Sequence, residues 1–552
     1  MHDVRRFLAA AAAALAGVTT IFSQASDTTI AGLRTRAEQS NYEETSTFDD
    51  VRRFVSALDG SPLVHVESFG NTEEGRDLPV VVISNPGVTS PSAARALGRP
   101  IVLIQANIHG GEVEGKEASL ALARRLVAGD LTELARQLVV LIAPNYNADG
   151  NERISVQNRT AQNGPVGGVG VRENARGLDL NRDHMKLDSA EARSLVGLVN
   201  RWDPHLVVDL HTTNGSYHGY HLTYSPILSP NADPSLIAFE REALLPAVRA
   251  AVEARHGFRS YYYGNFATDG GGPTPSRVDP NIPGDVAWRT FDHRPRFGNN
   301  YLGLRNRLAV LSEAYSYLDF KGRIDVTSAF VEELLREVAA RAEEVQTLTS
   351  EADRALTDDT SSNHPRVLGV TFEARPSAQP VEILVGDVVR TLNPRSGREM
   401  SQMTDRAVPV RMREYGTFAS TKSEAMPEGW VIPLAEVLSG RAGPVLDRLA
   451  AHGVRVDALT ASRSMPIERF ALSRVLEAER PFQGRREMRL EGWYEQATLT
   501  LEPGSLVVPA RQPLGRLAFT LLEAESDDGL AAWGIIEGLA AGHTFPIYRM
   551  VR

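Results

Sequence analysis

The 552-residue chain contains no cysteine, which excludes disulfide bonds and thiolate chemistry. Any metal site must therefore use histidine and carboxylate ligands. The chain also lacks a concentrated stripe of lysine and arginine, and its net charge of -10 argues against nucleic acid as the main partner. With 42% hydrophobic and 23% charged residues, its composition is that of a globular protein, and its length allows two or more domains.

Long apolar runs are scarce as well, and none after residue 25 is long enough to cross a membrane. Residues 1–25 differ from the rest, because Arg5 and Arg6 precede the apolar segment FLAAAAAALAGVTTIF, which ends at Ser23-Gln24-Ala25. This pattern predicts a secretory signal peptide; a membrane anchor that stays in the mature protein is the alternative. We expect an exported protein, periplasmic or extracellular, with no stable membrane insertion after removal of the leader.

Between residues 26 and 350, short apolar runs alternate with segments of helical periodicity. The runs IVLIQA, LVVLIAP, HLVVDL and NRLAVLSE have the character of buried strands, and helical patterns follow or separate them. This alternation predicts an α/β domain with a mostly parallel or mixed sheet flanked by helices. A long Gly/Pro-rich stretch, residues 264–300, is expected to wall a site, because loops of this length are otherwise uncommon in compact domains.

After residue 350 the texture of the sequence changes. A polar stretch predicts a linker over residues 351–365, and the short β-like runs beyond it predict a smaller β-rich accessory domain over residues 366–552. Residues 526–529, Ser-Asp-Asp-Gly, are interpreted as a solvated turn rather than a functional motif.

Three of the predicted strands end in residues capable of metal or acid–base chemistry. His109 and Glu112 lie in the turn after the first, His211 follows the third, and Glu313 ends the fourth. In open α/β sheets, ligands bind in the crevice at the carboxyl ends of the strands. Two histidines and one carboxylate with an open position are a catalytic zinc ligand set, and a further carboxylate can serve as general base. Taken alone, HxxE is more often a surface feature, and His211 alone would be an ordinary strand-edge histidine.

Taken in order, the motifs of residues 40–320 resemble those of the zinc carboxypeptidases, the M14 metallopeptidase family. The matching pieces are IHGGE at 108–112, NADG at 147–150, GLDLNRD at 177–183, LVVDLH at 206–211 and LSEAYSY at 311–317. Similar extra C-terminal domains occur in secreted bacterial members. Each motif is weak alone, and the set is specific.

The resemblance implies a role for each matching residue. His109, Glu112 and His211 would hold one Zn²⁺ per chain, and Glu313 would activate the water that attacks the peptide carbonyl and then protonate the leaving amine.

The GLDLNRD motif would contribute groups of another kind. Asn181 and Arg182 would grip the free carboxylate of the substrate, a task suited to the planar fork of arginine. Asp179 would hydrogen-bond the ring of a zinc histidine and fix its tautomer. For the arginine that stabilises the oxyanion, direct counting gives Gln162, and Arg159 lies three residues earlier; either could take the role.

Other positions depart from the family pattern. Gly111 stands where some members have a second anion-binding arginine. Phe291 stands near the expected phenol of the substrate pocket, and Tyr301 and His293 are possible substitutes. These differences concern substrate specificity more than hydrolysis.

The motifs together predict an exported zinc metallocarboxypeptidase that removes C-terminal residues from peptides. The alternative is a zinc-dependent deacylase or amidase with the same site, acting on N-acyl amino acids or cell-wall peptides. A non-enzymatic binding protein is disfavoured, because all three ligands and the candidate base are present.

Overall fold

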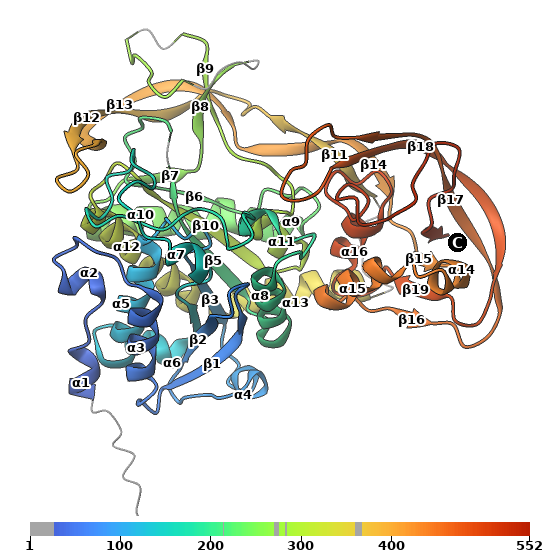
Figure 1. Cartoon of the computed structure of the whole chain (residues 1–552), viewed down its shortest axis with the longest axis horizontal. Helices are drawn as coiled ribbons and strands as arrows, with labels where there is room; N and C mark the ends of the chain where they lie inside the picture. Colours follow the sequence, from blue (N-terminus) through green and yellow to red (C-terminus); the bar gives the residue numbers. More distant parts are fainter. Residues whose placement is uncertain (1–26, 214, 270–274, 282–283, 359–366, 552) are drawn as a thin grey trace, which may run out of the picture.

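The computed structural model describes residues 27–213, 215–269, 275–281, 284–358 and 367–551. Its central element is an eight-stranded sheet with the strand order β1-β2-β4-β3-β5-β10-β6-β7 (Figure 1). The strands are β1 (Val64–Asn71), β2 (Asp77–Ile83), β3 (Ile101–Ala106), β4 (Val139–Ala143), β5 (Leu206–Thr213), β6 (Leu222–Ser225), β7 (Ser260–Tyr262) and β10 (Leu308–Tyr315).

The four middle strands, β4, β3, β5 and β10, run parallel to one another, and antiparallel pairs flank them on both sides. Every residue of β3, β4 and β5 is buried, as expected for strands covered on both faces. The mixed α/β sheet predicted from the apolar runs is confirmed. Its parallel centre brings the carboxyl ends of β3, β5 and β10 to one edge.

Helices cover both faces of this sheet. Gly115 at the start of α5 packs on Leu210, whereas Asp209, the preceding residue of β5, faces α8 and α11. On the α5 side lie α1 (Asp27–Ala31), α3 (Phe48–Leu58), α5 (Glu114–Ala128), α6 (Leu134–Gln137), α10 (Leu245–His256) and α12 (Phe320–Ala340). On the opposite side lie α8 (Ala190–Trp202) and α11 (Gly298–Leu304).

Shorter helices fill the connections. They are α2 (Arg36–Gln39), α4 (Pro91–Ala96), α7 (Ala148–Asn151), the 3-10 turn η1 (Leu180–Arg182), α9 (Pro234–Ala238) and the π-helical η2 (Phe239–Leu244). Helix α13 (Ala342–Thr357) then packs against α9 and α12. The expected linker therefore begins inside a helix: residues 351–357 are the end of α13, and residues 359–366 lie outside the described part of the chain.

A second sheet joins the Gly/Pro-rich stretch to residues far downstream. Its order is β12-β13-β9-β8, from β8 (Asn265–Thr268), β9 (Val286–Arg289), β12 (Val381–Leu392) and β13 (Glu399–Tyr415). Trp288 and Phe266 pack there with Val385 and Met412 in one buried cluster. Residues 381–415 thus pack against β8 and β9 rather than with the rest of the C-terminal residues, so the range 366–552 is divided between two places in the fold (Figure 1).

The remaining residues form a lobe beside the main sheet, called here the C-terminal lobe (residues 429–550) (Figure 1). Its six-stranded sheet contains β15 (Gly429–Ile432), β16 (Asp457–Ala458), β17 (Arg463–Glu477), β18 (Met488–Leu501), β19 (Leu506–Pro509) and β20 (Tyr548–Met550). Its helices are α14 (Leu434–Leu438), α15 (Gly443–His452) and α16 (Gly515–Leu522); the pair β11 (Val367–Arg375) and β14 (Thr417–Ala425) precedes and adjoins it. One hydrophobic core runs without interruption from the main sheet into this lobe.

The prediction of a solvated turn at residues 526–529 is wrong. Asp528 is fully buried and accepts hydrogen bonds from the backbone N–H and the Nε of Arg296, at 2.6 and 2.7 Å, and from the Trp533 indole. The carboxylate of Asp528 in the C-terminal lobe thus holds the loop that contains Arg296, which precedes α11. The polar sequence of this turn was misleading because the partner of Asp528, Arg296, lies about 230 residues earlier in the chain.

The predicted signal peptide lies outside the described residues. Among the residues that are described, no helix combines the length and the apolar character needed to cross a membrane.

Candidate active site

A cleft of about 130 Å³ opens at the carboxyl ends of β3, β5 and β10. It gathers nearly all the residues singled out in the sequence. Its lining includes His109, Glu112, Arg159, Asn181, Arg182, His211 and Glu313, together with Arg172, Thr212, Thr213, Tyr263, Phe291, Phe297 and Leu311.

The turn between β3 and α5 positions the first two candidate ligands. It is closed by a hydrogen bond from the backbone N–H of Glu112 to the His109 carbonyl at 2.9 Å. The glycines between them are required by close packing: a Cβ on Gly110 would lie 2.4 Å from the backbone nitrogen of Asn151, and one on Gly111 would lie 2.6 Å from the Gly170 carbonyl oxygen. No arginine can therefore occupy position 111 in this backbone, which accounts for the departure from the family pattern.

The side chains of His109, Glu112 and His211 converge on one point. Glu112 places its Oε1 3.0 Å from Nδ1 of His109 and its Oε2 3.0 Å from Nδ1 of His211. The two Nδ1 atoms are 3.3 Å apart, and all three side chains are buried. Among the described residues these three form a group whose ligand atoms all lie within 4.8 Å of one another, as a single metal ion requires.

Each histidine forms a hydrogen bond to a carboxylate through Nε2, the ring nitrogen that does not face the cluster. Nε2 of His109 donates to Asp179 at 3.0 Å, and Nε2 of His211 donates to Asp209 at 2.7 Å. These bonds place the protons on Nε2 and leave both Nδ1 lone pairs free for a metal. The contact from Asp179 to a histidine ring was predicted; Asp209 was not. Asp209 precedes His211 by two residues in β5, so the alternation of a strand already placed both on one face.

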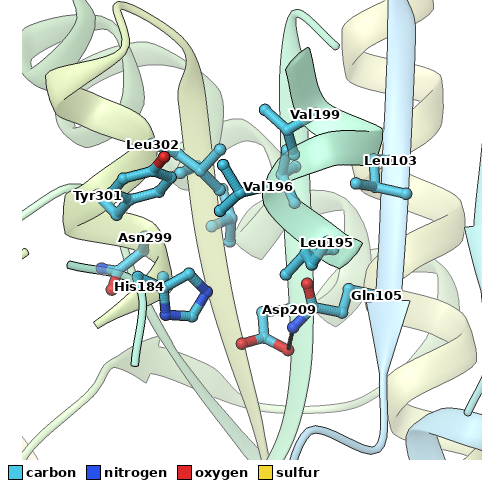
Figure 2. A pocket seen from close by; sticks show the side chains of 14 residues that line it. Leu103, Gln105, His184, Leu195, Val196, Val199, Asp209, Asn299, Tyr301 and Leu302 are labelled. Atoms are coloured by element: carbon cyan, nitrogen blue, oxygen red, sulfur yellow. Dashed lines mark hydrogen bonds between the residues drawn. The ribbon is translucent and has the colours of Figure 1, made fainter. Parts of the chain in front are cut away.

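Asp209 is fixed in turn by the layer beneath it. Its other oxygen accepts a hydrogen bond from the Gln105 side chain at 3.3 Å (dashed in Figure 2). Both residues border a mostly apolar cavity between the sheet and helices α8 and α11, and His184 faces the same space (Figure 2). The apolar surroundings strengthen the hydrogen bond that His211 donates to Asp209, because few competing dipoles are near.

The electrostatics of the cluster favour a bound cation. Burial alone would raise the pKa of Glu112, but His109 and Arg159 hold this pKa well below its usual range. Burial alone would lower the pKa of His211, but Asp209 and Glu112 hold it well above its usual range. The carboxylates that attract a proton to His211 attract a metal cation for the same reason, so this donor set fits zinc.

Two arginines approach the cluster from the loop after β4. Arg159 donates to Glu112 Oε1 at 2.9 Å, and Arg172 forms two bonds to Asp179 Oδ2 at 3.0 and 2.7 Å. Gln162 does not line the cleft; with its amide group turned, its oxygen accepts from the guanidinium of Arg159. Of the two oxyanion candidates, Arg159 is the one that reaches the cleft. Arg172, in the Gly-rich run GVGVRE, was missed because nothing local in the sequence marks it.

The GLDLNRD segment reaches the cleft opposite these arginines. Asn181 accepts a hydrogen bond from the Gly298 backbone N–H at 3.0 Å through its side-chain oxygen, so its amide nitrogen is the group that can donate to a ligand. The guanidinium of Arg182 lies 3.9 Å from the centre of the Phe297 ring. This stacking holds a planar cation at the rim of the cleft.

Glu313 faces the candidate metal ligands from the neighbouring strand. Parallel pairing of β10 with β5 places it directly beside His211. Its Oε2 is buried without a hydrogen-bond partner among the described residues, and burial raises the pKa of this carboxyl above its usual range. A carboxylate without competing bonds beside a ligand cluster is suited to accept a proton from water.

The phenol of the cleft comes from an unexpected position. Tyr263, between β7 and β8, lines the cleft and packs edge-to-face on Phe291 at 5.4 Å. Phe291 also lines the cleft, as expected, but neither substitute does: Tyr301 bonds His452 at 2.9 Å, and His293 bonds Asp527 at 3.0 Å. Three consecutive tyrosines at 261–263 gave no sign of which one would face the site.

Comparisons with known proteins agree with this geometry. Residues 56–233, which include His109, Glu112, Asn181, Arg182 and His211, match the family model described as zinc carboxypeptidase, Peptidase_M14. The chain carries an M14 zinc carboxypeptidase domain. These matches indicate a metallocarboxypeptidase, a peptide hydrolase, and the family whose model residues 56–233 match is zinc-dependent.

Relatives of this carboxypeptidase match along most of its length. It is 23% identical over 514 residues to "Carboxypeptidase 2" of Trichophyton rubrum, covering 90% of this chain and 84% of that protein, so the match extends well past residue 366. "Carboxypeptidase D" of Mus musculus is 34% identical over 144 residues, 23% of this chain and 10% of that protein. These relatives do not favour the deacylase alternative.

Solved metallocarboxypeptidases are among the structures to which part of this chain is similar. A putative carboxypeptidase A from Shewanella denitrificans covers 54% of this chain and 69% of its own, with 19% identity and a TM-score of 0.39. Carboxypeptidase A from Helicoverpa armigera covers 56% and 77%, with 15% identity and a TM-score of 0.39.

Proposed function

We propose that this metallocarboxypeptidase is exported and removes single residues from the free carboxyl end of peptides, with one zinc ion per chain. The observation that carries the proposal is the convergence of His109, Glu112 and His211 beside Glu313, whose Oε2 is buried without a hydrogen-bond partner among the described residues. Two histidines and one carboxylate leave a coordination position open, which separates a catalytic zinc site from a structural one. Export is supported by the composition of residues 1–25.

The chemistry divides between the ion and the chain. Zinc held by the three ligands would supply a Lewis acid that polarises the scissile carbonyl and acidifies water. Glu313 takes a proton from the attacking water and passes it to the nitrogen of the leaving amino acid. Arg159, 2.9 Å from Glu112, presents positive charge to the carbonyl oxygen as negative charge develops on it.

Substrate orientation comes from the opposite wall of the cleft. Arg182 receives the terminal carboxylate through its planar guanidinium, and the Asn181 amide adds a further donor. Stacking on Phe297 keeps Arg182 in place before the substrate arrives. The preference for a free C-terminus therefore follows from a charge pair at the rim of the cleft.

The central test uses zinc content and hydrolysis together. Purified protein should contain about one zinc per chain, and Glu313→Gln should keep this metal while kcat falls by roughly 100- to 10,000-fold, because the general base is lost. Glu351→Gln, on the exposed face of α13, is the matched control and should behave as wild type. Undiminished hydrolysis by protein stripped of metal would overturn the proposal.

A second experiment tests the terminal carboxylate. Wild-type enzyme should cleave peptides with a free C-terminus and spare the same peptides when amidated, and Arg182→Ala should raise KM for the free peptides. Arg176→Ala, an exposed arginine of the same loop, serves as control. Equal turnover of free and amidated peptides would remove the role given to Arg182.

A further inference from the structure

The C-terminal lobe forms hydrogen bonds to residues 179–188, a segment that contains Asp179, Asn181 and Arg182. His452 donates to the Met185 carbonyl at 3.0 Å, and Arg448 donates to the Lys186 carbonyl at 2.7 Å. These bonds hold the backbone downstream of the functional side chains.

The lobe also forms hydrogen bonds to Asp188. Arg485 forms two bonds to this carboxylate, at 2.6 and 2.7 Å, and Arg448 adds a third at 2.8 Å. Asp188 is mostly buried, and these arginines hold its pKa below the usual range although burial alone would raise it. The far end of the segment is therefore locked to the lobe by charge-assisted bonds.

At the near end of the segment, the described part of the C-terminal lobe contributes a contact from the side chain of Gln483. Asp179 donates its backbone N–H to the side-chain oxygen of Gln483 at 2.7 Å. The side chain of the same aspartate bonds Nε2 of His109 at 3.0 Å and the backbone N–H of Asn181 at 2.9 Å. A single hydrogen bond from the C-terminal lobe thus acts on the residue that orients a metal ligand and the start of the carboxylate-binding turn.

Gln483 occupies a position at which the backbone favours other residues. The connection between β17 and β18 closes in a tight turn, with Phe482 N–H bonded to the Arg485 carbonyl at 2.7 Å and Arg485 N–H bonded to the Phe482 carbonyl at 3.0 Å. Both central residues are left-handed, Gln483 with φ 51° and Gly484 with φ 81°. Such turns prefer Asn-Gly or Gly-Gly, because a longer side chain is strained there. The geometry of the turn gives no reason for a glutamine at position 483. The hydrogen bond that its side chain accepts from Asp179 does give a reason.

We propose that Gln483 is a positioning residue of the active site, through which the C-terminal lobe sets the orientation of Asp179 and so of His109 and Asn181. This inference rests on the roles given to those residues in the proposed function. The C-terminal lobe then contributes to the geometry of the active site. This contribution depends on the length of the Gln483 side chain.

The test uses the fact that the turn favours asparagine or glycine at position 483, whereas the contact with Asp179 requires a side chain as long as that of glutamine. Gln483→Asn keeps the amide and improves the turn, but its side chain is one methylene too short to reach Asp179; Gln483→Gly removes the group and also suits the turn. Both variants should keep or raise the melting temperature, while kcat/KM falls and the zinc dissociation constant rises, each by about three- to tenfold. Gln483→Glu, which retains an acceptor of full length, should restore both quantities.

Gln496→Asn, at an exposed position of β18 in the same hairpin, is the matched control and should change neither quantity. Wild-type zinc affinity and kcat/KM in Gln483→Asn would overturn the inference, and so would losses that parallel a fall in melting temperature. Zinc affinity is measured by competition with a chelator in the absence of peptide. An Arg182→Ala enzyme with intact peptide specificity would therefore count against the proposed function alone, and the Gln483 result would stand separately.

Discussion

Removing the carboxylate behind His211 is expected to weaken zinc binding without disturbing the fold of the sheet. Asp209 accepts from Nε2 of His211 at 2.7 Å and is itself nearly buried. In Asp209→Ala, His211 loses the partner that keeps its proton on Nε2, so part of the population carries the proton on Nδ1, where the metal binds. Gln105 loses its acceptor as well.

The size of the effect follows from the geometry. Carboxylate partners of metal-bound histidines contribute about 10- to 100-fold in metal affinity, which is about 1.4–2.8 kcal/mol. The apolar cavity beneath Asp209 places this bond near the upper end of that range, because water competes poorly for either partner there. Asp209→Asn keeps the shape and an oxygen acceptor but loses the charge, so its effect should be smaller, about tenfold.

Zinc dissociation constants from chelator competition provide the assay, with circular dichroism as a check on the fold. Asp405→Ala, at an exposed position of β13, is the control. If Asp209→Ala binds zinc as tightly as wild type, Asp209 does not set the tautomer of His211 and the reasoning fails. An equal loss in the Asn and Ala variants would show that charge, rather than hydrogen bonding, is the whole effect.

Three other substitutions give separate expectations. Tyr263→Phe should lower kcat/KM by about tenfold with unchanged zinc affinity, because the phenol lines the cleft without belonging to the ligand cluster. Asp528→Ala should lower the free energy of unfolding, followed by urea denaturation, by about 3–5 kcal/mol, since it leaves the Arg296 charge buried beside fewer partners. Burial lowers the pKa of His452 to about 3, and an unfolded histidine titrates near 6.5, so the unfolded state binds the extra proton between these values. Stability present at pH 7 is therefore lost as the pH falls below 6.5, by about 2 kcal/mol at pH 5 from His452, and His452→Leu should remove this part of the pH dependence.

The convergence of the candidate metal ligands could be predicted because it depends on local patterns. Apolar runs marked β3, β5 and β10 as buried strands, and parallel strands present their carboxyl ends at one edge. The residues that end those runs, among them His109, His211 and Glu313, must then meet. Asp209 was within reach of the same argument, since residues two apart on a strand share a face.

Contacts between distant segments had no such signal. Arg172 and Tyr263 reach the cleft from loops whose paths are set by tertiary packing, and Asp528 looked like a surface turn because its partner Arg296 is far away in the sequence. The sheet that β13 joins could not be predicted for a related reason. A β-rich texture predicts strands but says nothing of which sheet they join, and β13 pairs with β9 across the expected boundary.

The C-terminal lobe is attached to two segments that form walls of the cleft. One wall, residues 179–188, is tied to the lobe through Gln483, Arg448 and Arg485. The neighbouring loop, whose Phe297 stacks on Arg182, is tied to the same lobe through Arg296 and Asp528. Both attachments act on the side of the cleft proposed to receive the substrate, whereas the ligands His109, Glu112 and His211 are carried by the main sheet and its turns. The contact of Gln483 with Asp179 reaches a candidate zinc ligand, His109, and should affect metal affinity as well. Substitutions at Asp528 act on the substrate side of the cleft, so they should alter KM while zinc affinity stays close to that of the wild type.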